Sequence, residues 1–235
     1  MKALVLAAGK GTRLAGVSAG LPKPLIDVCG TTPLEHALGW VAGMRPALIW
    51  INVHDGAELV QQRIGMEAAG VPVRYSYEPE LLGTAGAWKK LEREWTETSL
   101  VVYGDNFMRF DLDALLGKHR AAGTLVTIAL FDPDRHANTG KGGGRVELER
   151  DRVRRFVEGG EEGLINAGAY FIEPALRERL SAGFVDFGHD VLPGLAASGE
   201  LAGHVVEEAG YCLGVDTPER LRIGRELART LEVPQ

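Results

Sequence analysis

The chain opens with Met1-Lys2-Ala3-Leu4-Val5-Leu6-Ala7-Ala8-Gly9-Lys10-Gly11-Thr12-Arg13-Leu14. The run Ala3–Leu6 is apolar throughout, as expected of a strand that is buried on both faces of a parallel sheet. A glycine-rich turn follows at the carboxyl end of this strand, where open α/β sheets bind their ligands. Small residues let backbone N–H groups approach phosphate oxygens closely, and Arg13 adds a fixed charge suited to two such oxygens. The stretch therefore predicts a buried first strand that leads into an anion-binding loop.

Beyond this loop, apolar runs of strand length alternate with segments of helical period. Strands are expected at 47–53, 71–76, 100–103 and 125–130, and helices at 33–44, 57–69, 84–95 and 111–121, with Thr84 as a helix N-cap. Such alternation predicts an α/β fold with helices on both faces of the sheet. The expected architecture is a Rossmann-like three-layer αβα sandwich with a mostly parallel mixed sheet.

The pattern changes after residue 131, where extended segments replace the strand–helix alternation. Extended stretches are expected at 145–148, 153–157 and 164–171, short helices at 174–180 and 190–197, further strands at 202–206 and 211–215, and a last helix at 218–231. We expect an antiparallel extension around 131–210 over one end of the sheet. No internal repeat or linker interrupts the chain, so residues 1–235 are predicted to form one domain.

Composition excludes several classes of protein. The formal net charge of −6 gives no general reason to expect nucleic acid as a partner. Cys29 and Cys212 are far apart in the sequence, which predicts neither a disulfide framework nor a structural zinc site. The apolar run at the N-terminus is too short for a signal peptide or a membrane span, so a cytoplasmic protein without a membrane partner is expected. The oligomeric state cannot be predicted from the sequence.

The glycine-rich loop does not match two common phosphate-binding motifs. GxxxxGK[ST], the Walker A pattern, is absent, and in the dinucleotide fingerprint GxGxxG the third glycine position is Leu14. A second element follows in Leu21-Pro22-Lys23-Pro24-Leu25, where two prolines should hold Lys23 in an extended segment.

Taken together, Gly9-x-Gly11-Thr12-Arg13-Leu14, seven residues and then Pro22-Lys23-Pro24-Leu25 resemble the signature of the sugar-phosphate nucleotidylyltransferase family. The resemblance implies the nucleotide-diphospho-sugar transferase type of fold. It also implies transfer of a nucleoside monophosphate from a nucleoside triphosphate to a sugar 1-phosphate, with Mg²⁺ as cofactor. Arg13, Lys23 and Asp105 are the catalytic residues that it implies. In-line displacement by an already ionised phosphate needs no general base.

The segment from Glu78 to Gly86 resembles the base-recognition loop of that family. An ionised carboxylate only accepts hydrogen bonds, and guanine offers two adjacent donors, so Glu78 favours GTP. UTP, or less readily CTP or dTTP, remains an alternative donor. The nucleotide-binding residues implied by the resemblance are Leu6, Ala7, Ala8, Gly9, Gly11, Thr12, Arg13, Lys23, Glu78, Gly83 and Thr84.

Two aspartates are the metal ligands that the resemblance implies. Asp105 ends a predicted strand within Tyr103-Gly104-Asp105-Asn106, and its hard oxygen atoms suit Mg²⁺. Near the C-terminus many relatives have Asp-Val-Gly-Thr-Pro, whereas this chain has Gly214-Val215-Asp216-Thr217-Pro218. Asp216 is therefore the expected second ligand, with an N-cap of the last helix as the other interpretation.

The sugar side is implied by three further matches. Gly144, Glu158 and Asn166 resemble the sugar-binding positions of the family, and a manno-configured hexose or heptose 1-phosphate is the favoured acceptor. The lysine that usually follows the glutamate is replaced by Gly159, and Lys141 or Arg145 could substitute for it. That departure leaves a nucleotide-binding homologue without catalytic activity as the alternative from a different class.

Overall fold

The computed structural model describes residues 1–9, 21–138 and 143–230. At its centre four neighbouring strands run parallel, in the order β4-β2-β1-β5. These strands are β1 (Ala3–Leu6), β2 (Ile49–Val53), β4 (Val71–Tyr77) and β5 (Ser99–Tyr103). The register pairs Leu6 with Asn52 on one side and with Tyr103 on the other. The carboxyl ends of the four strands therefore meet at one edge of the sheet.

The remaining strands extend this sheet in a mixed pattern. Among the described residues the full order is β3-β4-β2-β1-β5-β11-β7-β12-β10-β9, with β11 pairing β9 as well. The added strands are β3 (Glu67–Ala68), β7 (Val126–Phe131), β9 (Arg145–Glu149), β10 (Arg152–Val157), β11 (Leu164–Ile172) and β12 (Leu201–Val205). β11 runs antiparallel to β5 and β7, whereas β12 is parallel to β7. The α/β class and the mixed sheet predicted from the sequence are confirmed.

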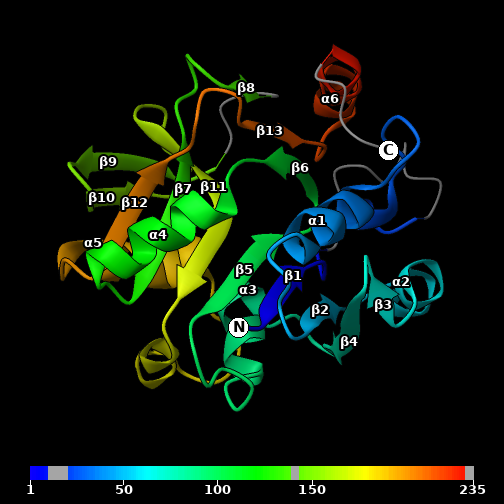
Figure 1. Ribbon diagram of the computed structural model, residues 1–235, viewed down its shortest axis with the longest axis horizontal. Coiled ribbons are helices and arrows are strands. Elements are labelled where there is room, and N and C mark those ends of the chain that lie inside the picture. Colours follow the sequence, from blue (N-terminus) through cyan, green and yellow to red (C-terminus); the bar gives the residue numbers. More distant parts are fainter. Residues whose placement is uncertain (10–20, 139–142, 231–235) are drawn as a thin grey trace.

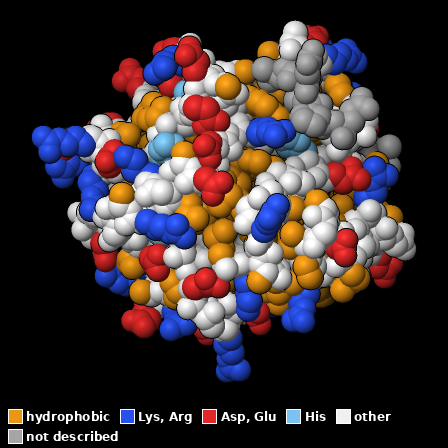
Figure 2. All heavy atoms as spheres, viewed as in Figure 1, with side chains coloured by type: hydrophobic (Ala, Val, Ile, Leu, Met, Phe, Trp, Pro, Cys, Tyr) orange, Lys and Arg blue, Asp and Glu red, His pale blue; other side chains and the backbone are white. Residues whose placement is uncertain are grey.

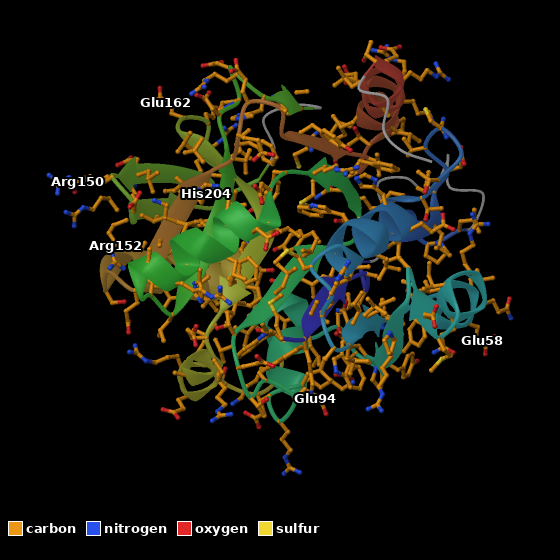
Figure 3. The ribbon with its side chains drawn as sticks, in the orientation of Figure 1. Glu58, Glu94, Arg150, Arg152, Glu162 and His204 are labelled. Carbon is orange, nitrogen blue, oxygen red and sulfur yellow. The ribbon has the colours of Figure 1, made fainter. Side chains whose placement is uncertain are left out.

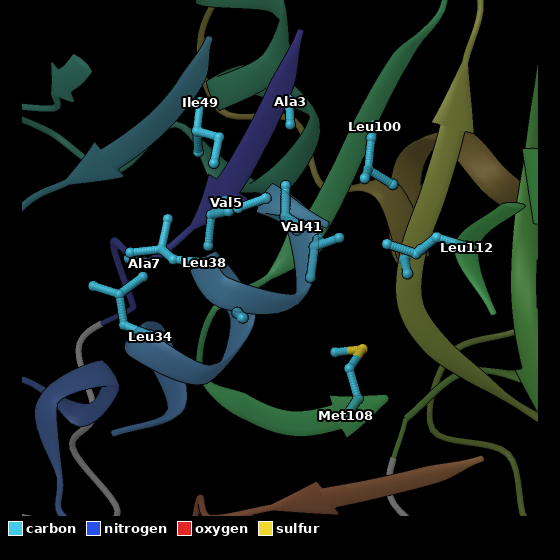
Figure 4. Packing of buried hydrophobic residues seen from close by; sticks show 14 of the residues in the cluster. Ala3, Val5, Ala7, Leu34, Leu38, Val41, Ile49, Leu100, Met108 and Leu112 are labelled. Carbon is cyan, nitrogen blue, oxygen red and sulfur yellow. The ribbon is translucent and has the colours of Figure 1, made fainter. Parts of the chain in front are cut away.

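Helices cover both faces of the sheet, which gives three layers (Figure 1). α1 (Pro33–Ala42) and α4 (Leu112–Ala122) cover one face, and α3 (Gly83–Lys90) and α5 (Leu192–Ala197) cover the other. Successive side chains of a strand point to opposite faces. Val5 accordingly packs with Leu38 of α1, as Figure 4 shows, while Leu4 packs in the cluster that contains Trp88 of α3.

A small second sheet lies beside the main one. It consists of β6 (Asn106–Arg109), β13 (Tyr211–Gly214) and β8 (Ala137–Asn138), and β13 runs antiparallel to β6. α6 (Pro218–Thr230) follows β13 directly and lies beyond it in Figure 1. This sheet connects the turn after β5 with the start of α6, two segments that are far apart in the sequence.

Several helices differ in extent from the expected ranges. The helix expected at 57–69 ends early, because Gly65 adopts a positive φ of 74° after α2 (Ala57–Ile64), and β3 takes up the following residues. The helix expected at 190–197 is preceded by a π-helical turn, η4 (Phe187–Val191), and the segment 174–179 forms the 3-10 helix η3 (Pro174–Arg179). These differences all lie at helix ends, where local sequence is least informative.

Charged side chains cover the end of β9 that lies beyond its pairing with β11. Glu147 and Glu149 form ion pairs with Arg155 and Arg154 of β10, and Arg150 and Arg152 project from the same edge in Figure 3. Such charges disfavour edge-to-edge pairing with another sheet. Figure 2 shows acidic and basic side chains intermixed on the face it displays. Within the described part of the chain, no helix has the length and apolarity needed to cross a bilayer.

Candidate functional site

A chain of hydrogen bonds joins the ends of three parallel strands. The backbone N–H of Ala7, just after β1, donates to Asn52 Oδ1 of β2 at 2.8 Å. The Asn52 amide donates in turn to Glu78 Oε1 at 2.9 Å, directly after β4. The other oxygen of Glu78 accepts from the backbone N–H of Leu82 at 3.1 Å. The first loop and the segment 78–82 are therefore held together through buried polar groups.

A cavity of about 190 Å³ opens beside this chain of bonds. It is lined by Leu6, Ala8, Gly9, Asn52, Glu78, Leu81, Gly83, Thr84, Tyr103, Asp105, Phe184 and Asp186. Six of the predicted nucleotide-binding residues and Asn52 are thus brought together with the sequence-distant Phe184. Glu78 is only 1% exposed and both its oxygens already accept hydrogen bonds within the protein. Its role in base reading stays a prediction, and it also positions the loop.

The start of α3 is joined to a segment about a hundred residues further along the chain. Gly83 has a positive φ of 71°, and a Cβ atom there would lie 2.5 Å from the carbonyl oxygen of Val185. That oxygen accepts from the N–H groups of Ala85 and Gly86, both at 3.0 Å. Only glycine combines this backbone conformation with so close an approach.

Thr84 does not cap α3, so that expectation was wrong. The helix begins at Gly83, and the Thr84 hydroxyl instead donates to Asp186 Oδ2 at 3.0 Å and accepts from the N–H of Phe187 at 2.8 Å. Asp186 Oδ1 accepts from the N–H groups of Gly188 and His189. Tertiary contacts have therefore taken the hydroxyl that local sequence assigns to the helix end.

A larger cavity of about 530 Å³ adjoins the first. Seven predicted site residues line it: Lys23, Thr84, Asp105, Gly144, Glu158, Asn166 and Asp216. Thr84, Tyr103, Asp105 and Asp186 line both cavities. The predicted catalytic, sugar and metal residues within the described part of the chain thus share one cavity, and that cavity adjoins the smaller one. Gly11, Thr12 and Arg13 lie outside the described residues.

Lys23 and Asp105 form a short ion pair at the junction of the two cavities. Lys23 Nζ lies 2.6 Å from Asp105 Oδ2, and the lysine side chain is 10% exposed. Lys23 begins the 3-10 helix η2 (Lys23–Leu25) rather than lying in an extended segment. Pro22 and Pro24, on either side of Lys23, each have a φ fixed by their ring. A hydrogen bond from the Leu25 N–H to the Pro22 carbonyl closes the turn.

Asp216 is brought to Asp105 by strand pairing. Gly214 of β13 lies opposite Asn106 of β6, so the two aspartates flank the same end of this strand pair. Arg220 donates to both oxygens of Asp216, at 2.9 and 3.2 Å. Burial acts to raise the pKa of Asp216, but this hydrogen bond and the charge of Lys23 lower it below its ordinary value. Asp216 is therefore ionised at neutral pH.

The N-cap interpretation of Asp216 is not supported, because Thr217 performs that role. The Thr217 hydroxyl accepts from the N–H of Arg220 at 3.2 Å, while the Asp216 side chain faces the large cavity. Two carboxylates fit Mg²⁺, which takes its other ligands from water and substrate phosphates. Among the described residues no group of three or more acidic, histidine or cysteine side chains forms a metal site of protein ligands alone.

Gly144 and Asn166 are placed together by the pairing of β9 and β11. A Cβ atom on Gly144 would lie 2.3 Å from the ring of Phe156, and its carbonyl accepts from the N–H of Asn166 at 2.9 Å. The Asn166 amide donates to the Tyr170 hydroxyl at 2.8 Å, across an irregularity in the pairing of β11 with β7. Close packing therefore requires glycine at 144, whereas Asn166 is positioned by its hydrogen bonds.

Glu158 lies after β10 in a half-buried position. Burial, and then the charge of Asp186, raise the pKa of Glu158 above its ordinary value, while His189 opposes the change. A Cβ atom on Gly188 would lie 2.4 Å from Glu158 Oε2, so the turn at 188 packs directly on this carboxyl. His189 and Arg220 are the cationic or potentially cationic residues that line the large cavity besides Lys23.

Arg145 is not one of the described residues that line the large cavity. It is 3% exposed, and its guanidinium donates to the carbonyls of Gly160 and Gly163 at 3.1 and 3.2 Å. The other suggested substitute, Lys141, lies outside the described residues.

Sequence reasoning missed Asp186, His189 and Arg220, because no local motif marks them and only the fold brings them to the cavity.

An apolar slot that adjoins a cavity with carboxylates and a lysine, at the carboxyl ends of parallel strands, defines an α/β protein of the nucleotide-binding class. Consistent with this, the chain belongs to the nucleotidyl transferase family, whose model matches residues 2–213.

Relatives of known activity support the family and differ in substrate. The zebrafish (Danio rerio) mannose-1-phosphate guanylyltransferase catalytic subunit beta is 28% identical over 95% of this chain, which spans only 63% of that relative's length. The D-glycero-alpha-D-manno-heptose 1-phosphate guanylyltransferase of Aneurinibacillus thermoaerophilus is 31% identical over 76% of this chain and 77% of its own. A Synechocystis UTP–glucose-1-phosphate uridylyltransferase is also 31% identical, over 85% of this chain and 56% of its own.

A solved structure has the same fold. HddC from Yersinia pseudotuberculosis, complexed with GMP-PN, superposes with a TM-score of 0.79 at 23% identity, over 96% of this chain and 98% of that one. The similarity extends over the full three-layer architecture, which confirms the Rossmann-like fold predicted from the sequence.

Proposed function

We propose that the protein transfers a nucleoside monophosphate from a nucleoside triphosphate to a sugar 1-phosphate and releases pyrophosphate. The observation that carries this proposal is the pair of adjoining cavities that share Thr84, Tyr103, Asp105 and Asp186. A reaction between two bound substrates needs two sites that meet at the reacting groups. Lys23 and Asp105 lie where the cavities meet.

GTP is the proposed donor. The Glu78 carboxylate lines the smaller cavity and offers only acceptors, which suits the adjacent donors of guanine. Two of the relatives described above are named guanylyltransferases. UTP remains the second candidate, because a relative of similar identity is a uridylyltransferase.

A manno-configured hexose or heptose 1-phosphate is the proposed acceptor. Gly144, Glu158 and Asn166 line the larger cavity together, and the last two offer carboxyl and amide groups to sugar hydroxyls. Asp186 and His189 add further polar groups to the same wall.

The residues act mainly by positioning and by stabilising charge. Lys23 would neutralise the α-phosphate and the incoming phosphate, whose oxygen attacks in line without a general base. Asp105 and Asp216 would hold Mg²⁺, which supplies additional positive charge to the phosphates when it is bound. Arg13 is proposed to bind the pyrophosphate side.

The test is pyrophosphate release in the presence of Mg²⁺, with five nucleoside triphosphates crossed against a panel of sugar 1-phosphates. Release that requires GTP and a manno-configured acceptor, and that stops on chelation of the metal, is the expected result. Nucleotide binding without release from any pair would support the homologue without catalytic activity. Release with UTP alone would overturn the donor assignment and retain the reaction.

A further inference from the structure

Phe184 is the one phenylalanine that the fold does not bury. The chain contains seven phenylalanines, and Phe184 is 68% exposed, whereas the other six are between 0 and 5% exposed. Exposing a large apolar side chain forfeits the free energy that its burial would provide. A single exposed apolar residue needs no explanation by itself. Phe184, however, lines the smaller cavity, so a bound ligand could cover its ring.

The ring lies at the rim of the smaller cavity, together with Leu6 and Leu81. These three apolar residues line the cavity together with polar ones, among them Asn52 and Glu78. Apolar surface beside a few polar groups is the environment that a flat heterocycle requires.

The backbone that carries Phe184 is held firmly against the nucleotide side. The next residue, Val185, donates its N–H to the Leu82 carbonyl at 2.8 Å and accepts from Ala85 and Gly86 through its own carbonyl. Thr84 binds Asp186, two residues after Phe184, at 3.0 Å. The ring is therefore exposed on an anchored segment at a defined position beside the cavity.

We propose that Phe184 is a base-contacting residue, whose ring packs on the nucleobase in the cavity that it lines with Leu6 and Leu81. This inference rests on the proposed function, because it assigns the smaller cavity to the base of the nucleotide. Stacking tolerates any base, since every base has a π-face. Phe184 therefore supplies affinity, whereas Glu78 and the nearby backbone supply discrimination.

The test compares nucleotide affinity of the wild-type protein with that of Phe184→Ala, by calorimetric titration with GTP, UTP and inorganic tripolyphosphate. Base–aromatic stacking predicts that the variant binds both nucleotides between about 5-fold and 100-fold more weakly. Affinity for tripolyphosphate, which has no base, should not change. Phe184→Trp should keep affinity close to that of the wild type. Met66→Ala is the matched control, because Met66 is also 68% exposed and lies away from both cavities.

Three outcomes would overturn the proposal. They are nucleotide affinity in Phe184→Ala within 2-fold of the wild type, an equal loss of nucleotide and tripolyphosphate binding, and a changed oligomeric state with unchanged affinity. The last would assign the ring to a protein contact. Failure of the wild type to bind any nucleotide would refute the proposed function itself, which is a separate result. Melting temperatures of all variants establish that each is folded.

Discussion

The Lys23–Asp105 pair places a cation where the proposed reaction would bring two negatively charged substrates together. The pair is short, at 2.6 Å, and the lysine side chain is largely buried. Replacing Lys23 by alanine removes a positive charge that would stabilise the transferring phosphate, so turnover should fall on the order of 10²-fold or more. Lys118→Ala is the control, since Lys118 pairs with Asp151 at the surface, at 2.8 Å. Normal turnover in the Lys23 variant would remove this residue from the mechanism.

Glu158 should show itself in the pH dependence of stability. Its pKa is raised in the folded protein by burial and by Asp186. As pH rises above 4.5, the ordinary value, the folded state retains this proton longer than the unfolded state, so the free energy of unfolding falls. In Glu158→Gln this decrease in the free energy of unfolding is absent, because glutamine does not titrate. The stability of the Gln variant relative to the wild type should therefore increase from pH 4.5 upward in urea titrations. A constant difference across that range would contradict the raised pKa.

Residues in continuous motifs could be identified from the sequence, and residues that meet through the fold could not. Lys23, Asp105 and Asn166 each stand in a short recognisable stretch, and all three line the predicted cavity. Phe184 and Asp186 follow no motif, because their segment is placed by bonds of Val185 and Asp186 to Leu82 and Thr84, about a hundred residues earlier. No local pattern records such a contact.

At the scale of elements, α3 illustrates how a helix start is set by tertiary packing. Gly83→Ala should destabilise the protein by about 1–3 kcal/mol, because φ is positive there and the new methyl group would meet the Val185 carbonyl. Gly117→Ala is the matched control: nothing lies within 4 Å of its Cβ position in α4, and alanine should add about 0.5–1 kcal/mol. Urea midpoints measure both. Equal stability of Gly83→Ala and the wild type would refute the packing argument.

Elements with strong local patterns were predicted well. β1 was placed at Ala3–Leu6, and the antiparallel strands β9, β10 and β11 fall within the extended stretches expected there, apart from one or two residues at their ends. β6 and β8 were missed, because their sequences, Asn-Phe-Met-Arg and Ala-Asn, contain neither an apolar run like that of β1 nor a clear alternation. Both pair with β13. That missed pairing is what brings Asp216 to Asp105.

At the scale of the whole molecule, three histidines tie stability to pH. Burial lowers the pKa of His36, His119 and His204 below the ordinary value of 6.5. The unfolded chain therefore binds more protons at mildly acidic pH, and the free energy of unfolding falls as pH drops from about 7 towards 5. The urea midpoint should be lower at pH 5.5 than at pH 7.5. A midpoint that stays constant or rises on acidification would contradict this prediction.

Hydrogen bonds join residues 82–86 to residues 185–187, and both segments contribute to the lining of both cavities. This coupling limits how substrate preference can change during evolution. A change in either segment alters the fit of both, so new donor and acceptor preferences should arise by paired substitutions rather than one at a time. A chimera that takes only one of the two segments from a relative would lose hydrogen bonds between them. Transferring both segments together would keep these hydrogen bonds, so the pair is the unit to exchange when substrate preference is to be changed.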